Sequence, residues 1–143
     1  MQQRLSLLTI GVRDIALARR FYEEGLGWQR GFGGHDVAMY QLGGMVFALY
    51  EWPKLAEDAG VSEEGSGFRG VTLAYNVESK EEVRAVLEEA RAAGARVMIE
   101  PRDTFWGGYD AYFADPDGHL WEVAWNPYWT LRDDGSVSLQ PPQ

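Results

Sequence analysis

The order of hydrophobic and polar residues in the first third of the chain predicts four strands, with one helix between the first and the second. The apolar segment 4–12 is typical of a strand, and Asp14 then has the position of a helix N-cap. The residues after it place an apolar stripe at helical spacing: Ile15, Ala18, Phe21 and Tyr22. Further strands are predicted over 28–33, 36–42 and 45–51. The last two are joined by the two-residue hairpin signal Gly43-Gly44, which completes a β-α-β-β-β order.

The same order of elements returns in the second half of the chain. Segment 68–77 predicts a strand, and Ser79 with Glu82 three residues later has the signature of a helix capping box. Gly94 stands where a left-handed residue would end that helix. Three more strands are predicted over these ranges: 96–100, 109–114 and 119–125.

This repeat predicts an α+β fold with two tandem βαβββ modules forming a half-open mixed sheet around a concave cavity. One module alone cannot bury both its helix stripe and its sheet face, so we expect the two to associate as one structural domain. The predicted boundaries are residues 1–52 for the first module, 53–67 for a linker, 68–127 for the second module and 128–143 for the C-terminal tail. The tail predicts a small hairpin around Asp134-Gly135.

Composition and charge narrow the classes of function. The net charge of −9 would repel phosphate backbones, so nucleic acid is not an expected partner. No apolar run approaches the roughly 18–20 residues that span a membrane, so no membrane association is expected. The start of the chain lacks a signal-peptide pattern, and a cytoplasmic location is the expectation. Cysteine is absent, which excludes disulfides and thiolate metal sites.

Two motifs stand at the first strand–helix junction and at the end of the second module: GVRDIALARRFYEEGLGW (11–28) and YFADPDGHLWEVAW (112–125). At this separation they resemble the vicinal oxygen chelate superfamily, which includes glyoxalase I, bleomycin-resistance proteins and extradiol dioxygenases. The resemblance covers about residues 5–127. In metal-dependent members it implies one His, Gln or Glu ligand on each of four strands around a divalent ion in a concave cavity. It also implies a homodimer.

Carrying that ligand set over places the four positions on Leu7, Ala48, Gly70 and Glu122, of which only Glu122 has a ligand side chain. We therefore predict no metal and no cofactor. The two histidines are interpreted as surface or turn residues. His119, for example, lies three residues from Glu122, and an odd separation on a strand puts the two on opposite faces.

The alternation of side chains along a strand predicts that Glu122 faces the cavity and that Trp121 and Val123 pack under the helix. The predicted cavity is mostly apolar with one carboxylate, which is typical of a site for an organic ligand. Burial would raise the pKa of Glu122. Its alternative role is a structural hydrogen bond to Thr72, Tyr50 or an arginine. The predicted ligand-binding residues are Leu7, Thr9, Ala48, Tyr50, Trp52, Gly70, Thr72, Trp106, Tyr112 and Glu122.

The sequence thus favours a homodimeric protein that binds a small aromatic or cationic molecule without a catalytic metal, rather than an enzyme. Two enzymatic alternatives remain open at this point. One is a metal-dependent lyase or dioxygenase, which the fold favours and the missing ligands oppose. The other is a metal-independent enzyme with Glu122 as its catalytic general base. A small-molecule sensor or accessory domain is a further alternative.

Overall fold

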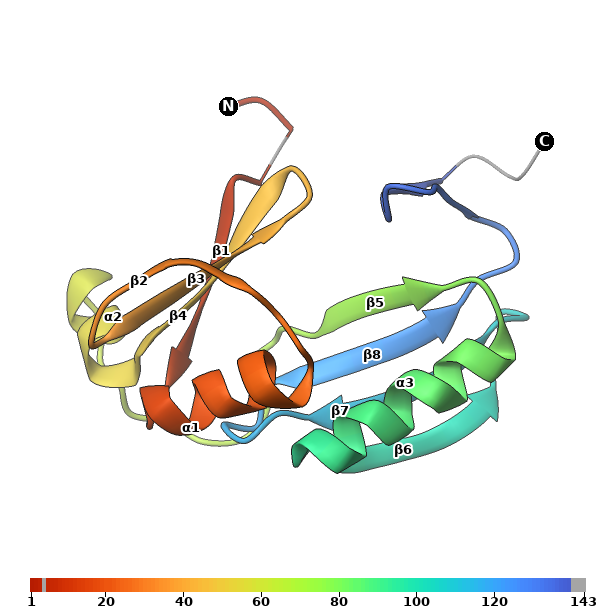
Figure 1. The fold of residues 1–143 in the computed structure, drawn as a ribbon. Coiled ribbons are helices and arrows are strands. Elements are labelled where there is room, and N and C mark those ends of the chain that lie inside the picture. Colours follow the sequence, from red (N-terminus) through yellow and green to blue (C-terminus); the bar gives the residue numbers. More distant parts are fainter. Residues whose placement is uncertain (4, 140–143) are drawn as a thin grey trace. The chain divides into compact units, whose positions relative to one another are not determined.

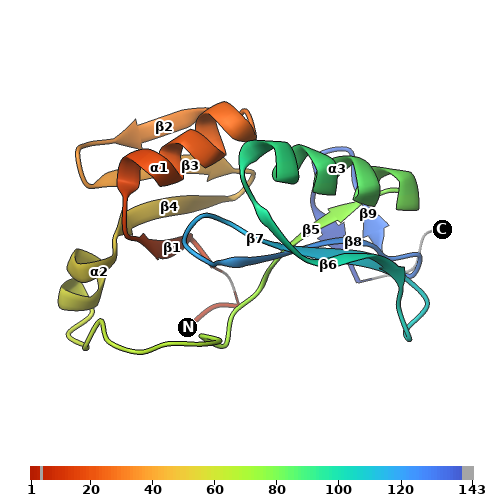
Figure 2. The ribbon, with the colours of Figure 1, turned by 90° about the horizontal axis from the view of Figure 1, so that it is seen from below.

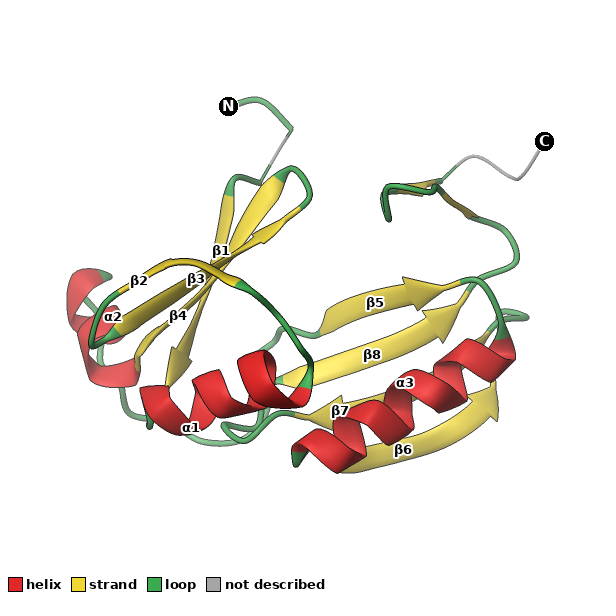
Figure 3. Ribbon diagram, in the orientation of Figure 1, coloured by secondary structure: helices red, strands yellow, loops and turns green. Residues whose placement is uncertain are grey.

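A computed structural model describes residues 1–3 and 5–139 of the protein. The chain forms two compact units that meet in sequence between Arg69 and Gly70. Each unit contains a four-stranded mixed sheet with a helix on it, as the colouring by secondary structure in Figure 3 makes clear. Within the described ranges, no helix combines the length and the apolar character needed to cross a membrane.

The sheet of the first unit has the strand order β1-β4-β3-β2. β1 runs parallel to β4, and the other neighbours are antiparallel. The turn between β3 and β4 contains Gly43 at a φ of +52°, which confirms the predicted hairpin. The strands are β1 (Leu7–Val12), β2 (Arg30–Gly33), β3 (Val37–Leu42) and β4 (Met45–Glu51).

The first helix packs on one face of this sheet (Figure 2). α1 (Ile15–Arg19) begins after Asp14, whose side chain accepts a hydrogen bond from the Leu17 N–H at 3.0 Å, as an N-cap does. The helix continues as a π-helical turn, η1 (Arg20–Gly25). Three of the four residues of the predicted apolar stripe are buried, and Ile15 is half-buried: Ala18, Phe21 and Tyr22 form the buried part.

An aromatic cluster forms much of the core beneath this helix. The ring of Tyr22 lies 5.1 Å from that of Trp28 and 5.4 Å from that of Phe47, measured between centroids. Tyr40 approaches Trp28 at 5.7 Å. Such tilted and edge-on contacts add to the apolar area that these rings bury. After β4, the short helix α2 (Trp52–Asp58) begins the segment predicted as a linker.

The sheet of the second unit repeats the first, with the order β5-β8-β7-β6. β5 is parallel to β8, and β8-β7 and β7-β6 are antiparallel. The strands are β5 (Leu73–Val77), β6 (Arg96–Asp103), β7 (Tyr109–Ala114) and β8 (Leu120–Trp125). A small hairpin of β9 (Thr130–Leu131) and β10 (Val137–Ser138) follows, as the tail sequence predicts.

The helix α3 (Lys80–Ala93) lies along one face of the second sheet (Figure 1). The Ser79 side chain accepts a hydrogen bond from the Glu82 N–H at 3.1 Å, and Gly94 ends the helix at a φ of +105°. Both capping signals in the sequence are confirmed. Val83, Leu87 and Ala90 are the buried residues of the helix.

The start of the second sheet differs from the sequence prediction. β5 begins at Leu73 rather than at residue 68. The segment before it contains Gly65, Gly67 and Gly70 at positive φ, and this left-handed backbone does not continue a strand. Gly70 and Thr72 therefore lie in the exposed connection that leads into β5.

Candidate functional site

Glu122 lies at the centre of the sheet face that points away from α3. In the strand register it stands opposite Tyr112 of β7 and beside Ala74 of β5. Asp110 lies two residues before Tyr112, so its side chain shares that face. The neighbours of Glu122 along β8, Trp121 and Val123, are buried on the other face, as alternation predicts.

The electrostatics of this face are set by two neighbouring carboxyl groups. Asp110 is only 4% exposed, and its Oδ1 accepts a hydrogen bond from Arg102 Nε at 3.1 Å. Burial raises the pKa of Glu122, and the negative charge of Asp110 and a hydrogen bond with Asp110 raise it further. A hydrogen bond with Tyr112 lowers this pKa, and the positive charge of Arg102 lowers it by a smaller amount. The positive charge of the Arg102 guanidinium thus acts on two carboxyl groups.

Glu122 lines a cavity of about 440 Å³ that lies wholly within the second unit. Its walls come from β5, from the turn between β6 and β7, from β8 and from the segment after β8. The lining combines three aromatic rings and two amides with a single carboxylate. The residues are Ala74, Asn76, Trp106, Glu122, Ala124, Asn126, Tyr128 and Trp129. The volume is in the range of sites for small organic ligands.

Trp106 is held at this cavity by a tight turn. The Gly108 carbonyl accepts from the Thr104 N–H at 3.0 Å, and the Gly108 N–H donates to Thr104 Oγ1 at 2.9 Å. The indole of Trp106 lies directly against Gly108, where a Cβ atom would overlap it. Glycine is therefore required at 108 for the close approach of the ring. This contact fixes one wall of the cavity.

Tyr128 and Trp129 enter the cavity from the segment after β8. Asn126 Oδ1 accepts a hydrogen bond from the Tyr128 N–H at 2.9 Å, which is a local turn closed by an Asn side chain. The Trp129 N–H donates to the Asn126 carbonyl at 3.4 Å. Asn126 thus bends the chain so that both aromatic residues follow the end of β8.

Of the predicted site residues in the second unit, Trp106 and Glu122 line this cavity and Tyr112 is the cross-strand partner of Glu122. Gly70 and Thr72 lie before β5 and are absent from its lining. Five polar or aromatic residues of this face were missing from the predicted site: Asn76, Asp110, Asn126, Tyr128 and Trp129. The signal for Asp110 was present, because it stands two residues before Tyr112 on a strand.

The other predicted site residues belong to the first unit. Leu7, Thr9, Ala48 and Tyr50 share the sheet face opposite the buried Phe47 and Leu49. Ala48 is itself only 1% exposed.

Trp52, the fifth predicted residue of the first unit, packs closely on Gly11 at the start of α2. Its Nε1 donates to the Glu63 carbonyl at 3.2 Å, and the guanidinium groups of Arg13 and Arg69 lie 4.9 and 5.5 Å from its ring. These contacts bind the connecting segment to β1.

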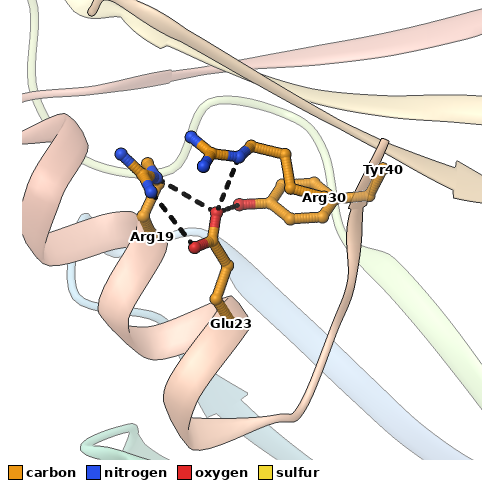
Figure 4. Close-up of polar contacts among 4 residues, drawn as sticks. All are labelled: Arg19, Glu23, Arg30 and Tyr40. Atoms are coloured by element: carbon orange, nitrogen blue, oxygen red, sulfur yellow. Dashed lines mark hydrogen bonds and ion pairs between the residues drawn. The ribbon is translucent and has the colours of Figure 1, made fainter. Parts of the chain in front are cut away.

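A second polar cluster surrounds Glu23 in the first unit (Figure 4). Glu23 Oε1 accepts hydrogen bonds from Arg19 Nε at 3.0 Å and from the Tyr40 hydroxyl at 3.1 Å, and Arg30 Nε lies 3.6 Å away. The hydrogen bond from Arg19 is the main cause that lowers the pKa of Glu23. Burial, reinforced by the Glu23 charge, raises the pKa of Tyr40. This cluster joins η1 to β2 and β3.

A sequence model of the Glyoxalase/Bleomycin resistance protein/Dioxygenase superfamily matches residues 4–123. The chain belongs to this superfamily. The resemblance seen in the two sequence motifs is thereby confirmed, together with the α+β fold of two tandem modules that it implied.

Solved structures of superfamily members are similar to this chain over most of its length. A glyoxalase-related enzyme from Fulvimarina pelagi is 37% identical, with a TM-score of 0.90, over 97% of this chain and 99% of that chain. A family enzyme from Burkholderia phytofirmans is 24% identical, with a TM-score of 0.74, over 84% and 96%. Lactoylglutathione lyase from Agrobacterium tumefaciens shares the fold at 17% identity, with a TM-score of 0.67, over 87% and 95%. The comparison with curated proteins gives no match.

The four positions that the superfamily resemblance assigns to metal ligands do not form a suitable donor set. Leu7, Ala48 and Gly70 have no side-chain donor atoms, and only Glu122 offers a carboxylate. Among the residues that the structure describes, no three His, Cys, Asp or Glu side chains lie close enough together to hold a metal. These side chains do not fit the metal centre that the resemblance implies.

Proposed function

We propose that the protein binds a small organic molecule with a cationic or aromatic group in the cavity of the second unit. The observation that carries the proposal is the combination of Glu122 with three aromatic residues in one cavity of about 440 Å³. The aromatic residues are Trp106, Tyr128 and Trp129. Faces of such rings attract organic cations, and a carboxylate supplies the opposite charge.

The charge balance around Glu122 supports a cationic ligand. Asp110 and Glu122 together carry two negative charges when both are ionised, and Arg102 supplies one positive charge. A bound ammonium group would offset the second charge. It would favour the ionised form of Glu122, whose pKa burial and Asp110 hold above its ordinary value. Binding of a cation should therefore release protons from this site near that pKa.

Isothermal titration with benzyltrimethylammonium at pH 8 tests the proposal. The wild-type protein should bind this ion, and Glu122→Gln should weaken binding by at least about tenfold because it removes the countercharge. Glu89→Gln is a matched control, since Glu89 is exposed on α3. Its binding should equal that of the wild type. Equal affinity in Glu122→Gln and the wild type, or no binding to the wild type, would contradict the proposal.

Proton transfer by Glu122 is a second candidate function, favoured by its raised pKa and by the 37% identity to a glyoxalase-related enzyme. A carboxylate with a raised pKa is a better base toward a weakly acidic C–H group. Exchange of the acidic protons of acetylacetone with deuterium from D₂O, followed by NMR, tests this role. The wild-type protein should accelerate the exchange more than Glu122→Gln does, and equal rates would exclude it for this probe.

A further inference from the structure

A second cavity, of about 330 Å³, lies between the end of the second sheet and the small hairpin of β9 and β10. Apolar residues among those that line it are Val77, Trp125, Pro127, Leu131 and Val137. Among the described residues that line it, Glu78 is the charged one, and Glu78 is exposed. This cavity, called here the hairpin cavity, offers an apolar surface to a ligand.

The hairpin cavity and the Glu122 cavity share part of their walls. Asn76, Asn126 and Trp129 line both of them. Trp129 is 41% exposed, so its ring is not locked in the protein core. The two cavities are therefore neighbouring parts of one surface of the second unit, with a carboxylate in one part and apolar side chains in the other.

We infer that the ligand of this site is an elongated amphiphilic cation, an inference that rests on the function proposed above. Its ammonium group would bind beside Glu122, and an alkyl or aryl chain would pass Trp129 into the hairpin cavity. A compact cation would leave the hairpin cavity unused. A chain that enters it would bury methylene groups against Leu131 and Val137 of the hairpin.

The size of the expected effect follows from the burial of the chain. A fully buried methylene group strengthens binding by roughly fourfold, and groups that stay partly exposed contribute less. Hexyltrimethylammonium carries five methylene groups more than tetramethylammonium. We therefore expect it to bind the wild-type protein at least about tenfold more tightly.

Two variants separate the hairpin cavity from the rest of the surface. Val137→Trp fills this cavity from a side chain that is 40% exposed, so that the core is not disturbed. Leu139→Trp is the matched control, because Leu139 follows β10, is 74% exposed and is absent from the lining of either cavity. Val137→Trp should abolish the advantage of the hexyl chain and leave tetramethylammonium binding unchanged. Leu139→Trp should preserve both affinities.

Isothermal titration of both ions with the wild-type protein, these two variants and Glu122→Gln distinguishes the outcomes. If tetramethylammonium binds through Glu122 but the hexyl chain adds nothing, the inference is wrong and the proposed function stands. A hexyl advantage that survives Val137→Trp also overturns the inference, because the chain then lies elsewhere. If the binding of neither ion depends on Glu122, the proposed function is wrong, and the inference that rests on it is wrong as well. The wild-type chain-length comparison keeps the test decisive even if Val137→Trp does not fold.

Discussion

Two glutamates, one in each unit, stand in opposite electrostatic environments. Glu23 of the first unit receives hydrogen bonds from Arg19 and Tyr40 and lies beside Arg30, and its pKa is lowered. Glu122 of the second unit lies near a second carboxyl group at the wall of a cavity, and its pKa is raised. The two sheets repeat one topology, so the difference comes from the side chains around each acid.

In the function proposed above, this comparison separates an acid that stabilises the fold from an acid that binds a ligand. The oxygen atoms of Glu23 are already engaged by groups of its own unit, and its charge is compensated within the protein. Around Glu122 the protein supplies less positive charge than two carboxylates require. Groups that cost stability in this way are common at functional sites.

Removal of the Glu23 carboxylate should have the largest effect on stability. Glu23→Ala leaves the buried Tyr40 hydroxyl without this acceptor and two arginines without their countercharge. We expect the free energy of unfolding in urea to fall by about 2–3 kcal/mol at pH 7, mostly from the lost hydrogen bonds because the arginines are partly exposed. Glu24→Ala, at an exposed position in the same turn, is the control. A loss no larger than that of the control would show that the polar cluster around Glu23 does not stabilise the fold.

The same variant has a pH dependence that follows from the lowered pKa of Glu23. A carboxyl group whose pKa is lower in the folded than in the unfolded state stabilises the protein above its unfolded pKa. That contribution is lost as the pH falls through the folded pKa. The stability difference between the wild type and Glu23→Ala should therefore shrink as unfolding is measured at progressively more acidic pH. A difference that stays constant would show that the charge of Glu23 does not stabilise the protein.

Gly108→Ala should disturb the Glu122 cavity without changing any charge. The new Cβ would overlap the ring of Trp106 and come within 2.7 Å of the Trp125 carbonyl oxygen. We expect a loss of about 1–3 kcal/mol in unfolding free energy and a changed tryptophan emission. Gly44→Ala is the control, because a Cβ there meets no atom within 4 Å. Unchanged emission in Gly108→Ala would mean that Trp106 does not depend on this contact.

Glu122→Gln should increase the stability of the protein, by less than the two substitutions above decrease it. A carboxyl group with a raised folded pKa favours the folded state most at low pH, and this advantage falls as the pH rises through the unfolded and then the folded pKa. Glutamine carries no charge to desolvate, so the variant should melt a few degrees above the wild type at pH 8. Near pH 4 the two should melt together. A lower melting temperature at pH 8 would make Glu122 a structural residue.

Arg102→Gln should produce the smallest effect, a further rise in the pKa of Glu122. Arg102 pairs with Asp110 and is the weakest of the influences on Glu122. Its removal leaves the two carboxyl groups less compensated. NMR titration of the Glu122 side-chain carboxyl carbon measures the change, with Arg84→Gln on α3 as the control. A fall in this pKa would mean that the acidic pair is wrongly described.

Local signals were sufficient to predict most of the fold. The caps at Asp14, Ser79 and Gly94 depend on residues within a few positions in sequence, and the structure confirms each of them. Alternation likewise put Glu122 on the face opposite Trp121 and Val123. The start of β5 was predicted too early, because apolar residues outweighed the glycines between Gly65 and Gly70.

The site was harder to predict because its members meet through long-range register. Asp110 approaches Glu122 only when β7 and β8 pair in one particular register. Tyr128 and Trp129 lie in a segment without strand periodicity, and the turn at Asn126 brings them to the cavity. The sequence marks such residues as turn or tail positions. Their convergence depends on how the strands pair and where the turns bend the chain.

The most direct test of the central claim is the pKa of Glu122 measured by NMR with and without saturating benzyltrimethylammonium. Without the ion, the pKa should lie above the ordinary value of a glutamate, because the group is half-buried beside Asp110. The account predicts that the bound cation lowers this pKa and that protons are released on binding near it. A Glu122 pKa that stays unchanged at saturation would contradict the account, because the carboxylate would then not be the countercharge of the ligand.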